Sequence, residues 1–113
     1  MSYELYEYYL DEGRLVPRKD CHTWNGATSN WTRALSLQTA RAWSASVLVP
    51  DTRGGLDMVI MGGADSSNRS LASIERLSLG KRRSELSKLR LPLPLSGHCA
   101  LQINSTHTFI TGM

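Results

Sequence analysis

The sequence has no long hydrophobic run. A membrane-spanning helix needs about 18 or more consecutive apolar residues, whereas the apolar stretches at 47–49 and 58–61 have only the length of a strand. Residues 1–4 carry neither the basic nor the apolar segment of a signal peptide. We therefore expect no membrane span, no membrane partner and no signal peptide at the start of this sequence.

Motifs that carry chemistry are also missing. The sequence contains no GxSxG nucleophile turn, no P-loop and no GxGxxG dinucleotide loop. Each of its two cysteines lies beside a histidine, in Cys21-His22 and in His98-Cys99. Adjacent residues on a strand point to opposite faces, and no CxxC or HxxxH spacing is present. The sequence therefore predicts that the chain is not an enzyme and has no catalytic residues, metal site or cofactor.

The excess of basic charge is small and local. The chain has 13 Lys and Arg against 10 Asp and Glu, and residues 69–90 hold seven basic residues but only two acidic ones. No aromatic side chains alternate with these charges, as they would in a surface that stacks nucleic-acid bases. We interpret the segment as a solvated loop with no nucleic-acid partner. Residues 81–84, Lys-Arg-Arg-Ser, also resemble a site for basic-directed kinases, although such short matches are frequent by chance.

What the sequence does contain is a series of strand signals separated by polar, Gly-rich turns. The expected strands lie near residues 20–25, 30–34, 43–49, 57–62, 72–79, 86–90, 98–103 and 107–111.

Two turns predict hairpins. Asn25-Gly26 is a two-residue hairpin signal, because both residues tolerate positive φ. The Pro- and Gly-containing residues 50–55 join two apolar runs, so we expect 46–49 to pair antiparallel with 58–61. Helix formers also cluster in 33–43 and in 81–91, where a short helix is the alternative.

An internal repeat organises the second part of the chain. Val47 aligns with Leu101 at an offset of 54, and Val59 aligns with Phe109 at an offset of 50, after a turn that is four residues shorter in the second copy. A period near 50 built from short strands is typical of a propeller with one four-stranded blade per repeat. The alignment favours strand and loop over helix for 33–43.

The glycine and tryptophan positions resemble those of the kelch-repeat β-propeller family. Gly62-Gly63 matches the double glycine of a kelch repeat, and Trp24 and Trp31 have the spacing of its aromatic residue and its tryptophan. No single repeat is complete, because Leu77 and Leu86 stand where the aromatic residue and the tryptophan are expected. By this resemblance Trp31 is buried between adjacent blades.

The resemblance implies an all-β fold of four-stranded antiparallel blades of a kelch-type β-propeller, incomplete in this chain. Residues 1–19 are then a partial strand region of a preceding blade or an N-terminal extension, and 20–113 form about one and a half blades. Met113 replaces the second glycine of the last pair. The chain is then either a degenerate repeat or a piece of a larger propeller, and the second is favoured because the sequence stops at the end of a strand.

The repeat alignment also bears on the cysteines. It assigns Cys21 and Cys99 to different repeats, so we expect no bond between them. It places His98 and Cys99 on an inner strand, where core packing is the expected role of both.

Kelch proteins usually bind another protein through loops at one end of the propeller. The resemblance therefore implies a protein-interaction module, and the candidate partner-binding residues are Arg41, Asp65, Ser66, Ser67 and Arg69. The alternatives are a secreted propeller that recognises glycans or matrix and a repeat fragment with no independent function. Open blade edges also give the chain a route to self-association.

Three Asn-x-Ser/Thr sequons begin at Asn30, Asn68 and Asn104, each at a predicted turn where a glycan could project into solvent. Coincidence in a Ser-rich chain explains them equally well. The sequons slightly favour a secretory or extracellular protein, and a cytoplasmic adaptor stays the alternative.

Overall fold

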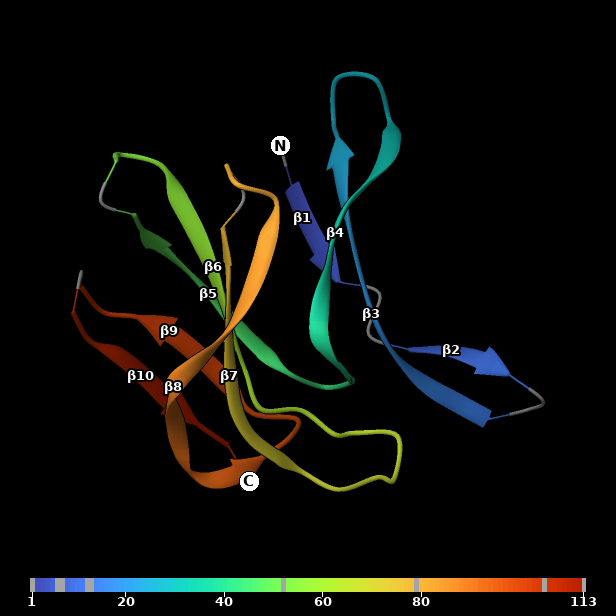
Figure 1. The fold of residues 1–113 in the computed structure, drawn as a ribbon, viewed down its shortest axis with the longest axis vertical. Coiled ribbons are helices and arrows are strands. Elements are labelled where there is room, and N and C mark those ends of the chain that lie inside the picture. The colour runs from blue at the N-terminus through green and yellow to red at the C-terminus, as the bar shows by residue number, and fades with distance from the viewer. Residues whose placement is uncertain are drawn as a thin grey trace.

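A computed structural model describes residues 2–5, 8–11, 14–51, 53–78, 80–104 and 106–112, and it confirms the all-β, antiparallel fold (Figure 1). The described strands are β1 (Ser2–Leu5), β2 (Tyr8–Asp11), β3 (Arg14–Asn25), β4 (Asn30–Arg41), β5 (Ala45–Pro50), β6 (Leu56–Met61), β7 (Leu71–Ser78), β8 (Arg83–Leu95), β9 (Cys99–Gln102) and β10 (Thr108–Thr111). In these residues there is no helix that could cross a membrane.

The central sheet contains β5, β6, β7 and β8 in chain order, and all its pairings are antiparallel. The predicted pairing of 46–49 with 58–61 is confirmed, with Val47 opposite Val59. Two local apolar runs and one turn are enough to specify this hairpin, because strand register follows the side-chain pattern and the turn. The β7–β8 pair contains two register shifts, which increase the local twist.

The first sheet is built around β3, which pairs with β1, β2 and β4. The β3–β4 hairpin differs from the predicted two-residue turn at Asn25-Gly26. Asn25 instead pairs with Asn30, and residues 26–29 form a four-residue turn between them. The Asn25 side chain accepts the backbone N–H of Ala27 at 2.9 Å, and its carbonyl oxygen accepts that of Ser29 at 2.7 Å. These bonds stabilise a turn that the dipeptide alone does not reveal.

The third sheet is the antiparallel pair β9–β10, which packs beside β5 of the central sheet. It repeats the order of β5 and β6, as the sequence alignment predicts.

Both segments with helical propensity are strands. Residues 33–41 belong to β4, and 83–91 belong to β8. Pairing within sheets overrides the intrinsic preference, which is a weak guide to structure. The prediction of strand and loop for 33–43 is confirmed.

The central sheet is covered on both faces. One hydrophobic cluster joins it to the first sheet, and its buried members are Cys21, Leu35, Leu37, Ile60 and Leu77. A second cluster lies between the central and third sheets, with Val47, Met61 and Leu91 buried and Val49, Val59, Ala72, Ile74, Leu95, Ala100 and Ile110 packed around them. The three sheets therefore stack face to face, with Val47 and Val59 of the first repeat copy in the contacts, whereas their aligned residues Leu101 and Phe109 are exposed.

Trp31 does not have the buried position that the resemblance implies. Its side chain is 45% exposed near the tip of the β3–β4 hairpin, where it packs across the strands on Trp24 with ring centroids 6.3 Å apart. Within this chain the tryptophan pair stabilises the hairpin.

Candidate functional site

Three connections meet at one end of the stacked sheets. They are the β4–β5 connection (42–44), the β6–β7 loop (62–70) and the β8–β9 turn (96–98), and together we call them the loop surface. Because β5 to β8 run antiparallel, these connections share one end, and the β5–β6 and β7–β8 turns lie at the other (Figure 1).

Backbone hydrogen bonds join the three connections to one another. Ala42 and Ala64 exchange two N–H···O bonds of 3.0 and 2.7 Å. The Gly97 amide donates to the Trp43 carbonyl oxygen at 2.8 Å, and the Ser70 and Ser96 hydroxyls lie 3.0 Å apart. The loop surface is therefore a bonded unit, with each connection held in place by the other two.

The double glycine allows this close approach. Gly62 and Gly63 have φ values of 69° and 99°, and a Cβ atom on them would meet the carbonyl oxygens of Leu95 and Ala42 at 2.5 and 2.7 Å. A side chain at either position would push the β6–β7 loop away from a neighbouring connection. These contacts are the physical reason for two consecutive glycines at this turn.

The β6–β7 loop carries four of the predicted partner-binding residues. Asp65 shapes the loop, because its carboxylate accepts the backbone N–H groups of Ser67 at 2.9 Å and Arg69 at 3.0 Å. Ser66, Ser67 and Arg69 are exposed, whereas Asp65 is half-buried. The structure thus places three of these side chains in solvent and gives Asp65 a positioning role.

Arg41 lies inside the protein, which corrects its assignment to a partner-binding surface. Its side chain is fully buried, and its guanidinium forms a 2.7 Å ion pair with the equally buried Glu75. It also donates to the carbonyl oxygens of Gly62 at 2.8 Å and Ser73 at 3.1 Å. Arg41 therefore holds β4 against the central sheet, and its bond to Gly62 fixes the start of the β6–β7 loop.

Trp43 is the site residue that the sequence reading missed. It lies in the middle of the loop surface, 46% exposed, with a backbone φ of 56°. The Ala42–Ala64 bonds and the Gly97–Trp43 bond hold it there. A signal was available, because the offset of 54 aligns Trp43 with Gly97, which has a φ of 67°. A left-handed position filled by glycine in one copy is occupied by tryptophan in the other.

His98 and Cys99 occupy different environments. His98 is buried, and burial lowers the pKa of its imidazole. Cys99 is exposed, which corrects its predicted place in the core. Both cysteines are free thiols, so the prediction that they are not bonded to each other is confirmed. The described residues contain no group of three or more His, Cys, Asp or Glu side chains arranged to hold a metal ion.

The three sequon asparagines are all exposed, at the start of β4 (Asn30), in the β6–β7 loop (Asn68) and in the β9–β10 turn (Asn104). Asn104 is engaged in its own turn, where its side-chain oxygen accepts the backbone N–H groups of Thr106 and His107 at 2.9 Å. The middle residue of that sequon, Ser105, lies outside the described residues, as does Met113.

The kinase-like motif ends on an inaccessible serine. Ser84 is buried, and its hydroxyl donates to the Ser36 carbonyl oxygen at 2.8 Å. A kinase could not reach this hydroxyl in the folded chain. The basic residues of the motif, 81–83, are exposed.

No protein-family model matches the chain, and a search of the curated proteins finds no match.

Proposed function

We propose that the three sheets are blades of a kelch-type β-propeller and that the chain is a protein-interaction module that binds its partner through the loop surface. The central sheet supports the blade assignment, because it has four antiparallel strands and a double glycine directly after the second strand. The β9–β10 pair begins the same pattern and is followed by Gly112. The β3–β4 hairpin then corresponds to the two outer strands of the preceding blade.

The exposed tryptophan in a left-handed backbone conformation carries the functional proposal. A side chain other than glycine in this region costs roughly 1–2 kcal/mol, and such residues concentrate at ligand-binding sites. Nearly half of the Trp43 surface is open to solvent at this strained position. An exposed aromatic surface held on hydrogen-bonded connections supports contact with a partner outside the chain.

The composition around Trp43 suits a protein partner. Tryptophan and arginine are enriched among the residues that dominate binding energy, and a polar rim surrounds them in typical interfaces. Here Arg69, Ser66 and Ser67 lie exposed on the loop whose base is bonded to the residue preceding Trp43. A rigid, bonded surface also loses little conformational entropy when it binds.

The test replaces Trp43 with Asn and compares this variant with Trp31→Ala. Asn tolerates positive φ better than tryptophan does, so W43N should keep or raise the stability of the fold while it removes the indole. Trp31 has the same exposure at the opposite end of the sheets, 45% against 46%. Proteins captured from cell extract by the wild-type chain are identified, and their affinity for each variant is then measured with purified material.

We expect W43N to weaken binding of the captured protein by about 30-fold, the effect of losing a dominant contact, and W31A to change it by less than about twofold. A photo-crosslinking residue at Ser67 should label the same protein, whereas one at Gly80 should not. The proposal fails if W43N binds as tightly as the wild type, or if crosslinking occurs only from Gly80.

A further inference from the structure

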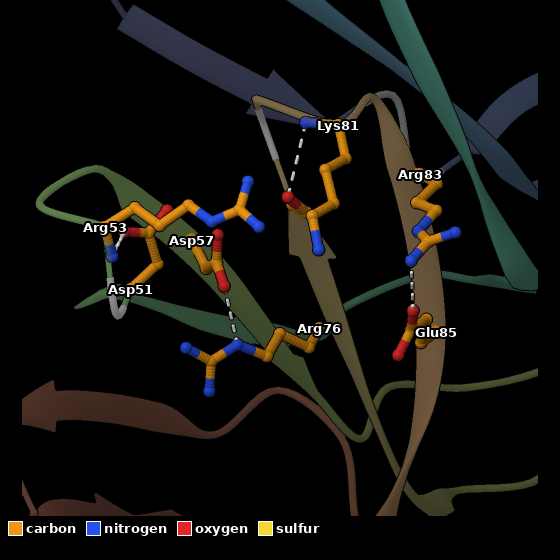
Figure 2. Close-up of a pocket in the computed structure, with 8 residues that line it drawn as sticks. Asp51, Arg53, Asp57, Arg76, Lys81, Arg83 and Glu85 are labelled. Carbon is orange, nitrogen blue, oxygen red and sulfur yellow. Dashed lines mark hydrogen bonds and ion pairs between the residues drawn. The ribbon is translucent and has the colours of Figure 1, made fainter.

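A charged cleft lies at the end of the central sheet opposite the loop surface. It is a hollow of about 250 Å³ between the β5–β6 and β7–β8 turns. Figure 2 shows its lining residues, which are Asp51, Arg53, Asp57, Arg76, Ser78, Lys81, Arg83 and Glu85. The proposed partner surface does not include any of them, so the cleft needs a separate explanation.

Four cations and three carboxylates line the cleft, and each carboxylate has a partner, although the Asp57 Oδ1 atom accepts no hydrogen bond from the described residues. Asp57 forms a 2.7 Å ion pair with Arg76, and Glu85 lies 3.4 Å from Arg83. The third carboxylate, Asp51, accepts the backbone N–H groups of Arg53 at 2.7 Å and Gly55 at 2.8 Å. These bonds lower the pKa of Asp51 and fix its carboxylate within the turn.

Two cationic side chains remain available. Among the described residues, neither the Arg53 guanidinium nor the Lys81 ammonium group forms an ion pair or a side-chain hydrogen bond. In Figure 2 the Arg53 side chain extends from the β5–β6 turn toward β7 and β8, and the Lys81 side chain descends into the same space. The two cations thus face a common hollow from two different turns, and like charges held near each other favour an anion between them.

We propose that this cleft binds a tetrahedral oxyanion, a phosphate or sulfate group, between Arg53 and Lys81. The planar guanidinium can donate two parallel N–H bonds to two oxygens of the anion, and the ammonium group supplies a compact charge on the other side. Arg76 and Arg83 line the same cleft, and each is balanced by its own carboxylate, Asp57 and Glu85. The cleft is open to solvent, so it can accept either a free anion or the same group attached to a larger molecule.

The first experiment titrates the whole 113-residue chain with inorganic phosphate and follows the backbone amides by NMR. We expect saturable shifts confined to the β5–β6 and β7–β8 turns. Arg53→Gln and Lys81→Gln should each weaken the affinity about fivefold, the scale of one exposed charge interaction. The matched controls Arg90→Gln and Lys88→Gln remove the same charges from exposed positions on β8 outside the cleft, and they should change the affinity less than about twofold.

A second set of titrations separates the sources of the anion. Inorganic sulfate tests whether charge and shape alone are sufficient, and a phosphoserine monoester tests whether the group can be attached to a larger molecule. Binding of the monoester as tight as that of phosphate identifies a modified partner as the source, whereas binding of the inorganic ions alone identifies a free anion. Both results support the site.

Three results would overturn the proposal. They are non-saturable shifts, shifts spread over the basic surface, and equal losses in the cleft and control variants. Circular dichroism and thermal unfolding of each variant exclude misfolding as the cause of lost binding. The proposed partner surface is tested independently, because W43N should leave phosphate binding unchanged.

Discussion

At the scale of single residues, the buried pair Arg41–Glu75 determines how the first sheet meets the central one. The Glu75 carboxylate accepts the backbone N–H groups of Gln38 at 2.6 Å and Thr39 at 3.2 Å, as well as the guanidinium of Arg41. The two charged side chains come from different sheets, and each is completely shielded from water. The pair therefore acts as a specific connection between two stacked layers, where apolar contacts alone would permit sliding.

Replacing Glu75 with Gln should lower the free energy of unfolding by about 3–5 kcal/mol, because Arg41 would keep a buried charge without a counter-ion. Urea unfolding followed by circular dichroism measures the loss. Glu85→Gln is the matched control, since it breaks an exposed pair with Arg83 and should cost about 0–1 kcal/mol. Equal effects of the two substitutions would contradict a special role for the buried pair.

The two cysteines should react very differently with thiol reagents. Burial raises the pKa of the Cys21 thiol to about 12, so this group stays protonated and shielded in the folded chain at any pH below that value. Cys99 is a free thiol exposed to solvent, so the reagent can reach it in the folded chain. Mass spectrometry after brief alkylation at about pH 8 should show a single label on Cys99, with Cys21 labelled only in denaturant. Rapid labelling of Cys21 in the native chain would disprove its place in the core.

At the scale of elements, the β6–β7 loop requires Gly63, because this position has a positive φ and leaves no room for a side chain. Ala at this position would combine an unfavourable φ with backbone contact at Ala42, so we expect a loss of about 2–4 kcal/mol in unfolding free energy. Gly54→Ala isolates the first effect, because φ is 84° there but no atom lies within 4 Å of the added Cβ, and it should cost about 1–2 kcal/mol.

Gly80→Ala completes the series. The space around Gly80 is open and its backbone is not left-handed, so we expect a change within about 0.5 kcal/mol of the wild type. Chemical unfolding of the three variants should therefore rank Gly63→Ala as the most damaging and Gly80→Ala as the least. The reverse order would mean that the contact between the β6–β7 loop and Ala42 is not stabilising.

Strands and hairpins could be predicted from the sequence where the signal is local. Alternating apolar residues and a Pro/Gly turn specify the β5–β6 hairpin, and each of the expected strands overlaps one that is observed. Arg41 was misplaced because its partner Glu75 is 34 residues away on another sheet. Trp43 was missed because its significance lies in a backbone conformation, which becomes visible only when the aligned Gly97 is known to be left-handed.

At the scale of the whole molecule, the chain exposes more surface than a compact protein of its size. Its accessible area is 7522 Å², whereas a monomer of 12.6 kDa is expected to expose about 6,200 Å². The largest contributions from apolar residues include Leu89 at 74%, Leu101 at 67% and Leu93 at 65% exposure. Leu89 and Leu93 lie on β8 of the central sheet and Leu101 lies on β9, so apolar surface is open to water on both the central and the third sheet.

This surface should make the isolated 113-residue chain self-associate. Leu101 and Phe109 are direct cross-strand neighbours on β9 and β10, and they are 67% and 55% exposed. Burying one large apolar side chain contributes roughly 1.5–3 kcal/mol, so pairing two such faces gives a sizeable driving force against a total stability of about 5–15 kcal/mol. Among the described strands β10 pairs only with β9, so its other edge can extend a sheet.

Light scattering coupled to size-exclusion chromatography over a hundredfold dilution tests this expectation. The apparent mass should rise with concentration for the wild-type chain, and it should rise much less for the double variant L101T/F109T, because threonine keeps the strand propensity while it removes most of the apolar area. Leu56→Thr is the control, since Leu56 is 50% exposed near the β5–β6 turn and lies away from the third sheet. A monomer whose mass and cooperative unfolding are independent of concentration would show that the chain closes its own core.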